Sequence, residues 1–201
     1  MQMRHQSYPT RHVIYVNSPE PGGEDINRDY ERILGDLIAT SSNLEISYGP
    51  TRSPHQNYLT PLQNQPLDDY DLFLKIDDDD IYFSNYVAEV VKDFVALRWD
   101  YSGSHAEGYL KGPHLIAQEL SGLGLSEEDL KLAIPEMMPP TIALSRKAVR
   151  AIFDVDDTGE WEDFLWRQHL AKVSGIKMAV RRKSNFVYNI HGGNVSTASF
   201  F

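Results

Sequence analysis

The sequence predicts an α/β fold in which an open, mostly parallel sheet is flanked by helices. Three short runs rich in β-branched and aromatic residues, 12–17, 43–50 and 69–76, have the composition of strands. Segments with helical spacing of apolar residues lie between these runs, and this βαβαβ order is typical of parallel sheets. Ligands bind such sheets outside the carboxyl ends of the strands, so a functional site is expected there.

The helices of the first half are predicted from apolar spacing and from capping residues. DINRDYERILGDLIAT (25–40) separates the first two strands. A second helix begins after Ser53, which can cap it, and Pro54 suits the first helical position. Pro61 is expected to kink or shorten this helix.

The clearest amphipathic segment is YVAEVVKDFVAL (86–97), for which Ser84 is the predicted cap. Its apolar stripe comprises Val87, Val90, Val91, Phe94 and Val95. The segment 99–140 is less regular. The patterns that follow predict a strand in 139–145, helices in 145–155 and 161–175, and strand-like structure in 176–193.

Composition excludes several classes of function. The 201 residues include no cysteine, which removes thiol catalysis, disulfide frameworks and Cys-ligated zinc. The formal net charge of −10 argues against a nucleic-acid partner, which needs a basic face. No signal peptide is visible, and no apolar run approaches the roughly 20 residues that cross a bilayer. We therefore expect a cytoplasmic protein without a transmembrane segment.

Four consecutive aspartates, Asp77–Asp80, follow the third predicted strand. Neighbouring carboxylates repel one another unless a cation or solvent offsets their charge. Two carboxylates one residue apart on a turn can hold a hard cation such as Mg²⁺ or Mn²⁺, which in turn binds phosphate oxygens. The alternative is a solvated acidic turn or a cluster of charge at a helix N-terminus.

The segment YDLFLKIDDDDIY (70–82) resembles the DxD region of GT-A-fold glycosyltransferases, especially family-2-type enzymes. The resemblance implies that Asp77 faces the nucleotide ribose and the metal, and that Asp79 coordinates the metal bridging the donor diphosphate. Because the run is ambiguous by one residue, Asp78 or Asp80 could take either task.

A second element of the resemblance is GEWEDFLWRQHLA (159–171), in which Glu162 and Asp163 begin a predicted helix. They resemble the "ED" element of inverting family-2-type enzymes, in which the aspartate deprotonates the acceptor hydroxyl. Inverting transfer needs one such base beside the anomeric carbon, and Asp163 is the candidate. The alternative is that both acids only complement the helix dipole. Trp161 and Trp166 could flank a sugar ring, and the alternative is core packing for at least one of them.

The third element is NIHGGN (189–194), where the resemblance makes His191 a further metal ligand. The alternative is a turn histidine without a partner. Asn17 and Ser18 end the first strand, where the family places a loop that touches the base.

Arg52 and Asn57 follow the second strand and are candidates for contacts with the diphosphate or the base. For Arg52 a surface ion pair is the alternative. The "PTYN" loop and the "DDGS"-type strand end of the family are absent, which places the chain on a distant branch. The basic run Arg181–Lys183 is predicted to be a solvated strand edge, and the alternative is that it neutralises the leaving diphosphate near the metal.

Together these elements predict a single GT-A-like domain over 1–201, with a nucleotide-binding half at about 11–98 and an acceptor-binding half at about 99–201. The function that the resemblance implies is a metal-dependent, inverting glycosyltransferase. It would use Mn²⁺ or Mg²⁺, a UDP- or GDP-sugar donor, and a glycan or other hydroxyl acceptor.

Two other functions stay open. One is a noncatalytic module that binds nucleotide sugars or glycans. The other is a nucleotidyltransferase, although its glycine-rich, lysine-bearing loop is not seen, because SPEPGG (18–23) contains no lysine.

Overall fold

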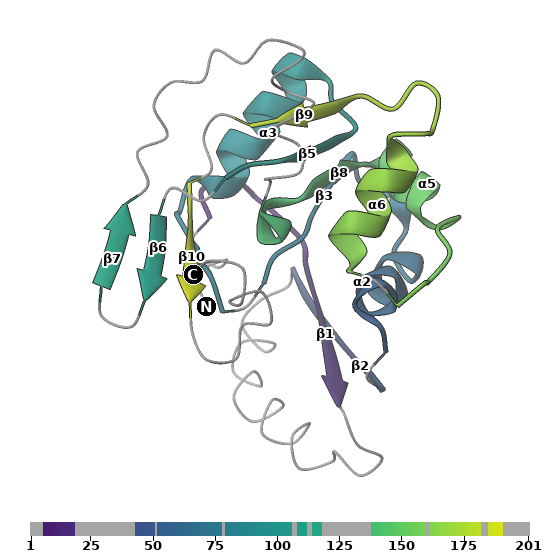
Figure 1. Ribbon diagram of the computed structural model, residues 1–201, viewed down its shortest axis with the longest axis horizontal. Helices are drawn as coiled ribbons and strands as arrows, with labels where there is room; N and C mark the ends of the chain where they lie inside the picture. Colours follow the sequence, from purple (N-terminus) through teal and green to yellow (C-terminus); the bar gives the residue numbers. More distant parts are fainter. Residues whose placement is uncertain are drawn as a thin grey trace. The chain divides into compact units, whose positions relative to one another are not determined.

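The computed structural model describes most of the chain as two compact units that interleave along the sequence (Figure 1). The described residues are 6–18, 43–50, 52–77, 79–105, 108–111, 114–117, 138–159, 161–181 and 185–190. The first unit comprises Met1–Tyr8, Asp71–Ala148 and Ser174–Phe201, and the second comprises Pro9–Tyr70 and Val149–Val173. The expected single domain with two binding halves stays a prediction, since these contacts do not show what either part binds.

The second unit contains two parallel strands and two neighbouring helices. Strands β1 (His12–Ser18) and β2 (Leu44–Pro50) pair along their whole length, as the sequence predicts. Helices α2 (Pro54–Gln63) and α6 (Glu162–Leu170) contact each other (Figure 1). The helix predicted for 25–40 lies outside the described residues.

The start of α2 follows the predicted capping pattern. The Ser53 hydroxyl accepts a hydrogen bond from the Gln56 N–H at 3.2 Å, and Pro54 occupies the first helical turn. Pro61 lies inside the helix, which ends at Gln63. A 3-10 turn over Leu67–Asp69 follows, so the third strand begins at Leu72 and not at residue 69 as predicted.

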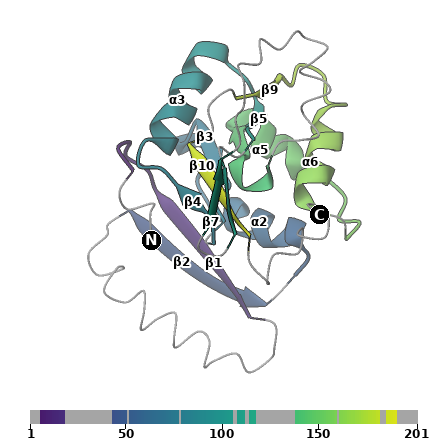
Figure 2. The same ribbon diagram turned by 60° about the vertical axis from the view of Figure 1, so that its left-hand side comes forward.

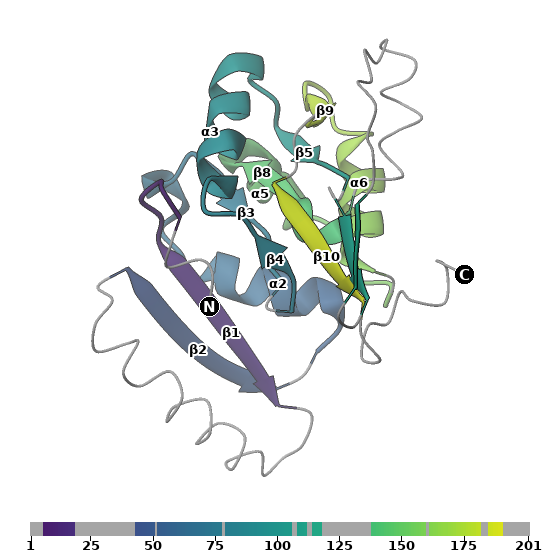
Figure 3. The same ribbon diagram turned by 90° about the vertical axis from the view of Figure 1, so that its left-hand side faces the viewer.

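The first unit contains two four-stranded sheets. One has the order β3-β8-β5-β9, formed by Leu72–Leu74, Ala143–Ser145, Tyr101–Gly103 and Met178–Val180. The other has the order β4-β10-β6-β7, formed by Ile81–Tyr82, Phe186–Ile190, Gly108–Lys111 and His114–Ala117. Strand β10 lies alongside β4 in Figure 3. A 3-10 turn, Pro139–Thr141, precedes β8.

The α/β class is confirmed, but the pairing is more mixed than the predicted, mostly parallel sheet. Among the described strands, β1–β2, β5–β9 and β6–β10 are parallel. The pairs β3–β8, β5–β8, β4–β10 and β6–β7 are antiparallel. One reason is that the segment predicted to be irregular forms β5, β6 and β7, whose last two strands pair antiparallel as neighbours in sequence.

Helix α3 covers residues Tyr86–Leu97, the bounds that the apolar spacing predicts, and packs beside β3 and β5 (Figure 2). The apolar stripe is narrower than predicted, because Val87 and Val90 are buried whereas Val95 is 55% exposed. The predicted cap was wrong. The residue before the helix is Asn85, and its side chain makes no capping hydrogen bond. Ser84 instead contributes its backbone carbonyl, which accepts the Ser7 N–H.

The later helices are shorter than their sequence patterns. Helix α5 covers Arg146–Ile152, and α6 ends at Leu170 rather than near Gly175, which has a φ of +78° in the turn beyond. Among the helices of the described residues, none is long and apolar enough to cross a bilayer. The cytoplasmic location stays a prediction.

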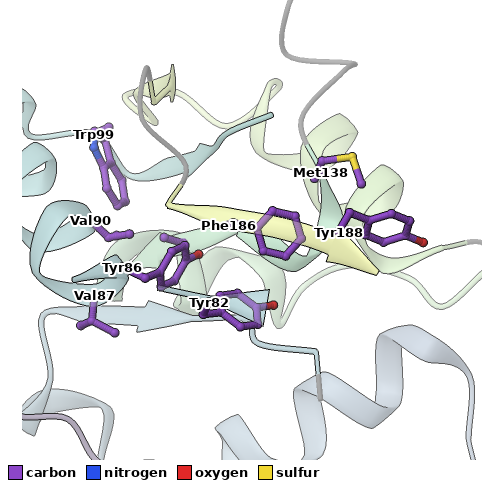
Figure 4. Close-up of a cluster of buried hydrophobic side chains, with 9 residues drawn as sticks. Tyr82, Tyr86, Val87, Val90, Trp99, Met138, Phe186 and Tyr188 are labelled. Carbon is purple, nitrogen blue, oxygen red and sulfur yellow. The ribbon is translucent and has the colours of Figure 1, made fainter. Parts of the chain in front are cut away.

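The core of the first unit is rich in aromatic residues (Figure 4). Its buried members are Tyr82, Tyr86, Val87, Val90, Trp99, Met138, Ala143, Phe186 and Tyr188. The Tyr82 ring lies 4.9 Å from the Tyr86 ring and 5.2 Å from the Phe186 ring, measured between centroids. This packing holds β4 against α3 and β10.

Two substitutions on α3 test this core. We expect Val90→Ala to lower the free energy of unfolding by about 2 kcal/mol, because it leaves a cavity at a buried position. Val95→Ala on the same helix should change it by less than about 0.5 kcal/mol, because that side chain is exposed. Urea unfolding measures both, and equal effects would contradict the assignment of the buried face.

Candidate functional site

Residues 75–80, called here the aspartate turn, join the edge strands of the two sheets in the first unit. Strand β3 ends at Leu74, and β4 begins at Ile81. The prediction that the aspartates follow a strand is therefore confirmed.

Lys75 balances the charge of Asp77. Its ammonium nitrogen lies 3.1 Å from Asp77 Oδ1 and 3.2 Å from Oδ2, so both carboxylate oxygens are in reach. The Lys75 side chain is 5% exposed and the Asp77 side chain 25% exposed. An ion pair shielded from water in this way is stronger than a surface pair. One of the four negative charges is thus compensated within the chain.

The Tyr82 hydroxyl joins the aspartate turn to the core. It accepts a hydrogen bond from the Asp77 N–H at 3.0 Å and donates one to the Pro140 carbonyl at 3.1 Å. Burial raises the pKa of Tyr82 well above its ordinary value, and the charge of Asp77 adds to the effect. The hydroxyl therefore stays protonated and keeps donating to Pro140.

Asp80 is buried, with 6% of its surface exposed, at the other end of the turn. Its Oδ1 accepts the Asn189 N–H at 2.9 Å, and the Asn189 side-chain amide donates to the Asp79 carbonyl at 2.9 Å. Asn189, on β10, thus holds both residues. Asp80 Oδ2 is buried and has no hydrogen-bond partner in the part of the chain that the structure describes.

The surroundings of Asp80 disfavour its ionised form. Burial raises the pKa of this carboxyl to about 7, and the nearby charges of Asp79 and Asp77 act in the same direction. The Asn189 N–H opposes the shift only in part. A carboxylate that is buried and half satisfied is the group that a bound cation would stabilise most.

The predicted metal ligands are only partly visible. Asp79 is exposed, whereas Asp78 and His191 lie outside the described residues. Within the described ranges no group of three or more His, Asp or Glu side chains is arranged to hold a metal ion. The carboxylate oxygens of Asp79 and Asp80 nevertheless fit the donors that Mg²⁺ and Mn²⁺ prefer. The metal site therefore stays a proposal.

In the second unit, Glu162 and Asp163 form the first turn of α6, as predicted. Glu162 is buried, Asp163 is half-buried, and Trp161, which precedes the helix, is 53% exposed. Trp161 provides no side-chain cap, and both acids lie in the first turn, where negative charge complements the positive end of the helix dipole. This placement is compatible with both sequence interpretations, a base or a helix-stabilising pair.

A buried hydrogen bond that the sequence does not reveal connects α6 to α2. The Trp166 indole N–H donates to His55 Nδ1 at 2.8 Å, and both residues are almost fully buried. The Tyr58 ring packs edge-on to the Trp166 ring at 6.0 Å. The two bonded residues are 111 positions apart. The only sequence signal for His55 is its place beside Pro54 at the start of α2.

The predicted nucleotide contacts are placed in part. Arg52 is exposed, and its backbone N–H and carbonyl are held by the Asn57 side chain at 3.2 and 3.3 Å. Asn57 therefore orders the loop before α2. Asn17 and Ser18 end β1 opposite Gly49 and Pro50, while their side chains lie outside the described set. Their contacts with a base stay predictions.

The prediction of a solvated edge at Arg181–Lys183 was wrong for Arg181. This residue is 2% exposed, and its guanidinium donates to the Thr141 carbonyl and lies over the Tyr86 ring at 5.6 Å. The guanidinium makes a cation–π contact with the Tyr86 ring, and this contact helps to compensate for the burial of a basic residue. Residues 182–184 lie outside the described ranges.

Comparison with known proteins places the fold. No protein-family model matches the sequence, and no curated protein matches it significantly. Solved structures do match over nearly the whole chain. The mixed α/β arrangement of helices and sheets corresponds to the GT-A-like fold of these structures, which confirms the predicted fold class.

Several of the matching structures are of Staphylococcus aureus TarS. Residues 1–349 of TarS in complex with UDP-GlcNAc align with 96% of this chain at a TM-score of 0.64 and 14% identity. The UDP complex aligns with 94% of it at a TM-score of 0.59 and 12% identity. This chain covers 54% of that TarS fragment and 33% of the longer TarS structure. It thus spans about half of the fragment.

The raised pKa of Asp80 predicts a pH dependence of stability in metal-free buffer. Between about pH 4 and 7 the folded protein binds more protons at Asp80 than the unfolded chain does. The free energy of unfolding contributed by this group therefore falls as pH rises, by roughly 2–4 kcal/mol across the window. Urea unfolding in EDTA at several pH values measures it.

The matched variant is Asp80→Asn, whose side-chain oxygen can still accept the Asn189 N–H. We expect this variant to lose the decline with pH and to exceed the parent in stability at pH 7. Asp71→Asn is the control, because the Asp71 side chain is 84% exposed. A parent and an Asp80→Asn variant with the same pH profile would contradict the burial of an ionisable carboxyl.

Proposed function

We propose that this chain is a metal-dependent glycosyltransferase that moves a sugar from a nucleotide-sugar donor to an acceptor hydroxyl with inversion. The observation that carries the proposal is the aspartate turn, which follows β3 and contains a buried carboxylate oxygen without a described partner. This turn occurs in a fold similar to that of TarS, which has been solved with UDP and with UDP-GlcNAc. We therefore expect a UDP-sugar donor.

The aspartate turn is the proposed site for Mn²⁺ or Mg²⁺, with Asp77, Asp79 and His191 as ligands. Asp78 and Asp80 are the alternatives within the run. Because Lys75 already pairs with Asp77, and Asp80 Oδ2 is buried without a partner among the described residues, Asp80 is the carboxylate of the described turn that a cation would stabilise most. When bound, the metal offsets negative charge that develops on the leaving diphosphate.

Asp163 is the proposed general base. It would accept the proton of the acceptor hydroxyl as the new bond to the anomeric carbon forms. Direct displacement by that hydroxyl inverts the anomeric configuration. Glu162 is the second carboxylate of this pair, and the exposed ring of Trp161 could stack on a sugar.

The donor nucleotide would contact the ends of β1 and β2. Asn17 and Ser18 end β1, and Arg52 lies in the loop after β2. The Arg52 side chain is exposed, so its charge is accessible to a diphosphate. Asn57 contributes by shaping this loop through its two bonds to Arg52.

Nucleotide binding is the first test. We expect UDP to bind in the presence of Mn²⁺ and to lose at least tenfold in affinity in EDTA, because the acidic turn repels a diphosphate without a cation. Calorimetric titration of UDP and GDP into the full chain measures both. Asp79→Ala should abolish the gain in nucleotide affinity that the metal provides. Asp71→Ala, a change at an exposed position, is the control. Binding of neither nucleotide under any metal condition would contradict the proposed donor site at the aspartate turn.

The assignment of Asp163 predicts a loss of turnover without a loss of donor binding. Asp163→Asn should lower the transfer rate by about 10²–10⁴, because the amide cannot take the proton. Asp156→Asn, an exposed change in the loop before α6, is the control and should keep the parental rate. Rates are measured from UDP release with an acceptor present.

The outcomes also separate the alternatives. Full turnover of Asp163→Asn would remove this residue from its role. Metal-dependent nucleotide binding without transfer to any acceptor tested would indicate a noncatalytic binding module. Release of pyrophosphate from a nucleoside triphosphate would indicate a nucleotidyltransferase.

A further inference from the structure

Two side-chain hydrogen bonds connect the start of α2 to α6 and to the loop before it. One is the buried bond from Trp166 to His55, and the other joins the Ser53 hydroxyl to Asp157 Oδ2 at 2.5 Å. We call this pair of bonds the α2–α6 clasp. Both bonds lie within the second unit, and their residues are more than one hundred positions apart.

The bond to Trp166 determines the chemical form of His55. An indole N–H can only donate, so His55 Nδ1 must accept and cannot carry a proton. The imidazole is therefore neutral, with its proton on Nε2. Because His55 is fully buried and Trp166 is 1% exposed, water cannot substitute for either partner if the bond is lost.

The second bond holds the loop before α6. Asp157 accepts the Ser53 hydroxyl through Oδ2 and the Gly159 N–H at 3.0 Å through Oδ1. Both hydrogen bonds lower the pKa of Asp157, so it is ionised and accepts at neutral pH. Gly159 has a φ of +79°, a conformation that favours glycine, and it lies three residues before the start of α6.

The position of Trp166 on α6 relates the clasp to the predicted base. Asp163 precedes Trp166 by three residues, so the two side chains emerge from adjacent turns of one helix. Asp157 lies five residues before the start of α6 and bonds the preceding loop to Ser53. The start of α2 is thus bonded to α6 through Trp166 and to the loop before α6 through Asp157.

We propose that His55 and Trp166 are positioning residues for Asp163, because their buried hydrogen bond holds the first turns of α6 against α2. The inference rests on the proposed function, in which Asp163 is the base. General-base catalysis requires the carboxylate to lie within hydrogen-bond reach of the acceptor proton. Small displacements of a catalytic group cost large factors in rate, whereas donor binding at other residues is unaffected.

The test uses the full chain and three variants. Trp166→Phe keeps an aromatic ring but removes the N–H donor. His55→Leu removes the acceptor, whereas His55→Asn can place its side-chain oxygen near the position of Nδ1. We expect Trp166→Phe and His55→Leu to lower kcat ten- to hundredfold, with less than a twofold change in the donor KM, and His55→Asn to recover most of the loss.

A coupling experiment separates positioning from general destabilisation. When Asp163→Asn is already present, adding Trp166→Phe should cause no further loss of the residual rate, because the group that it positions is gone. Assays at a temperature at which each variant is fully folded, verified by circular dichroism, remove the effect of lowered stability. An undiminished kcat in both Trp166→Phe and His55→Leu, or full additivity with Asp163→Asn, would overturn the proposal.

Hydrogen exchange provides a readout that does not need catalysis. The Leu165 N–H donates to the Trp161 carbonyl at 3.1 Å, which is the first such bond of α6. Amides of residues 165–170 should exchange at least tenfold faster in Trp166→Phe and His55→Leu, and at the parental rate in His55→Asn. Parental exchange in all three variants would show that the bond does not hold α6, and would also overturn the proposal.

The two readouts distinguish failure of the clasp from failure of the proposed function. Faster exchange with full turnover in Asp163→Asn would retain the clasp as a restraint on α6 and overturn its role in positioning a base. Parental exchange together with loss of turnover in Asp163→Asn would keep Asp163 as the base and show that His55 and Trp166 do not position it.

Discussion

The aspartate turn depends on the buried hydroxyl of Tyr82. The ring of Tyr82 packs against Tyr86 and Phe186, so the hydroxyl is held by the aromatic core rather than by the turn. From there it accepts the N–H of Asp77 and donates to the carbonyl of Pro140. A hydroxyl that both donates and accepts in a dry environment fixes two backbone segments at once. The geometry of the acidic site is therefore imposed by apolar packing, which does not change with pH or with metal.

Charge is distributed unequally along the turn. Asp77 is neutralised by Lys75, Asp79 is exposed to solvent, and Asp80 is buried with one oxygen satisfied by Asn189. Repulsion among neighbouring carboxylates is reduced because these three differ in partner and in access to water. The remaining cost falls on Asp80, whose pKa rises to about 7. A cation at the turn would remove this cost, so ligand binding and stability are expected to be coupled there.

In the second unit, hydrogen bonds connect residues that lie more than one hundred positions apart in the sequence. Trp166 and His55 form a neutral pair in a buried environment, and Ser53 both caps α2 and bonds Asp157. An apolar contact would bury as much surface, but a hydrogen bond adds a preferred direction. Such a bond orients one helix on another, which is the property that a helix carrying a catalytic base requires.

The sequence by itself determined the local elements. The spacing of apolar residues predicted α3, the β-branched and aromatic run 12–17 predicted β1, and Ser53 followed by Pro54 predicted the start of α2, because these patterns depend on residues close together in sequence. It also located the carboxylates beyond β3. Only the tertiary structure decided the mixed strand pairing, the burial of Asp80 and the bond of His55. The burial of Asp80 and the bond of His55 depend on Asn189 and Trp166, more than one hundred positions away, and no local pattern encodes a contact at that distance.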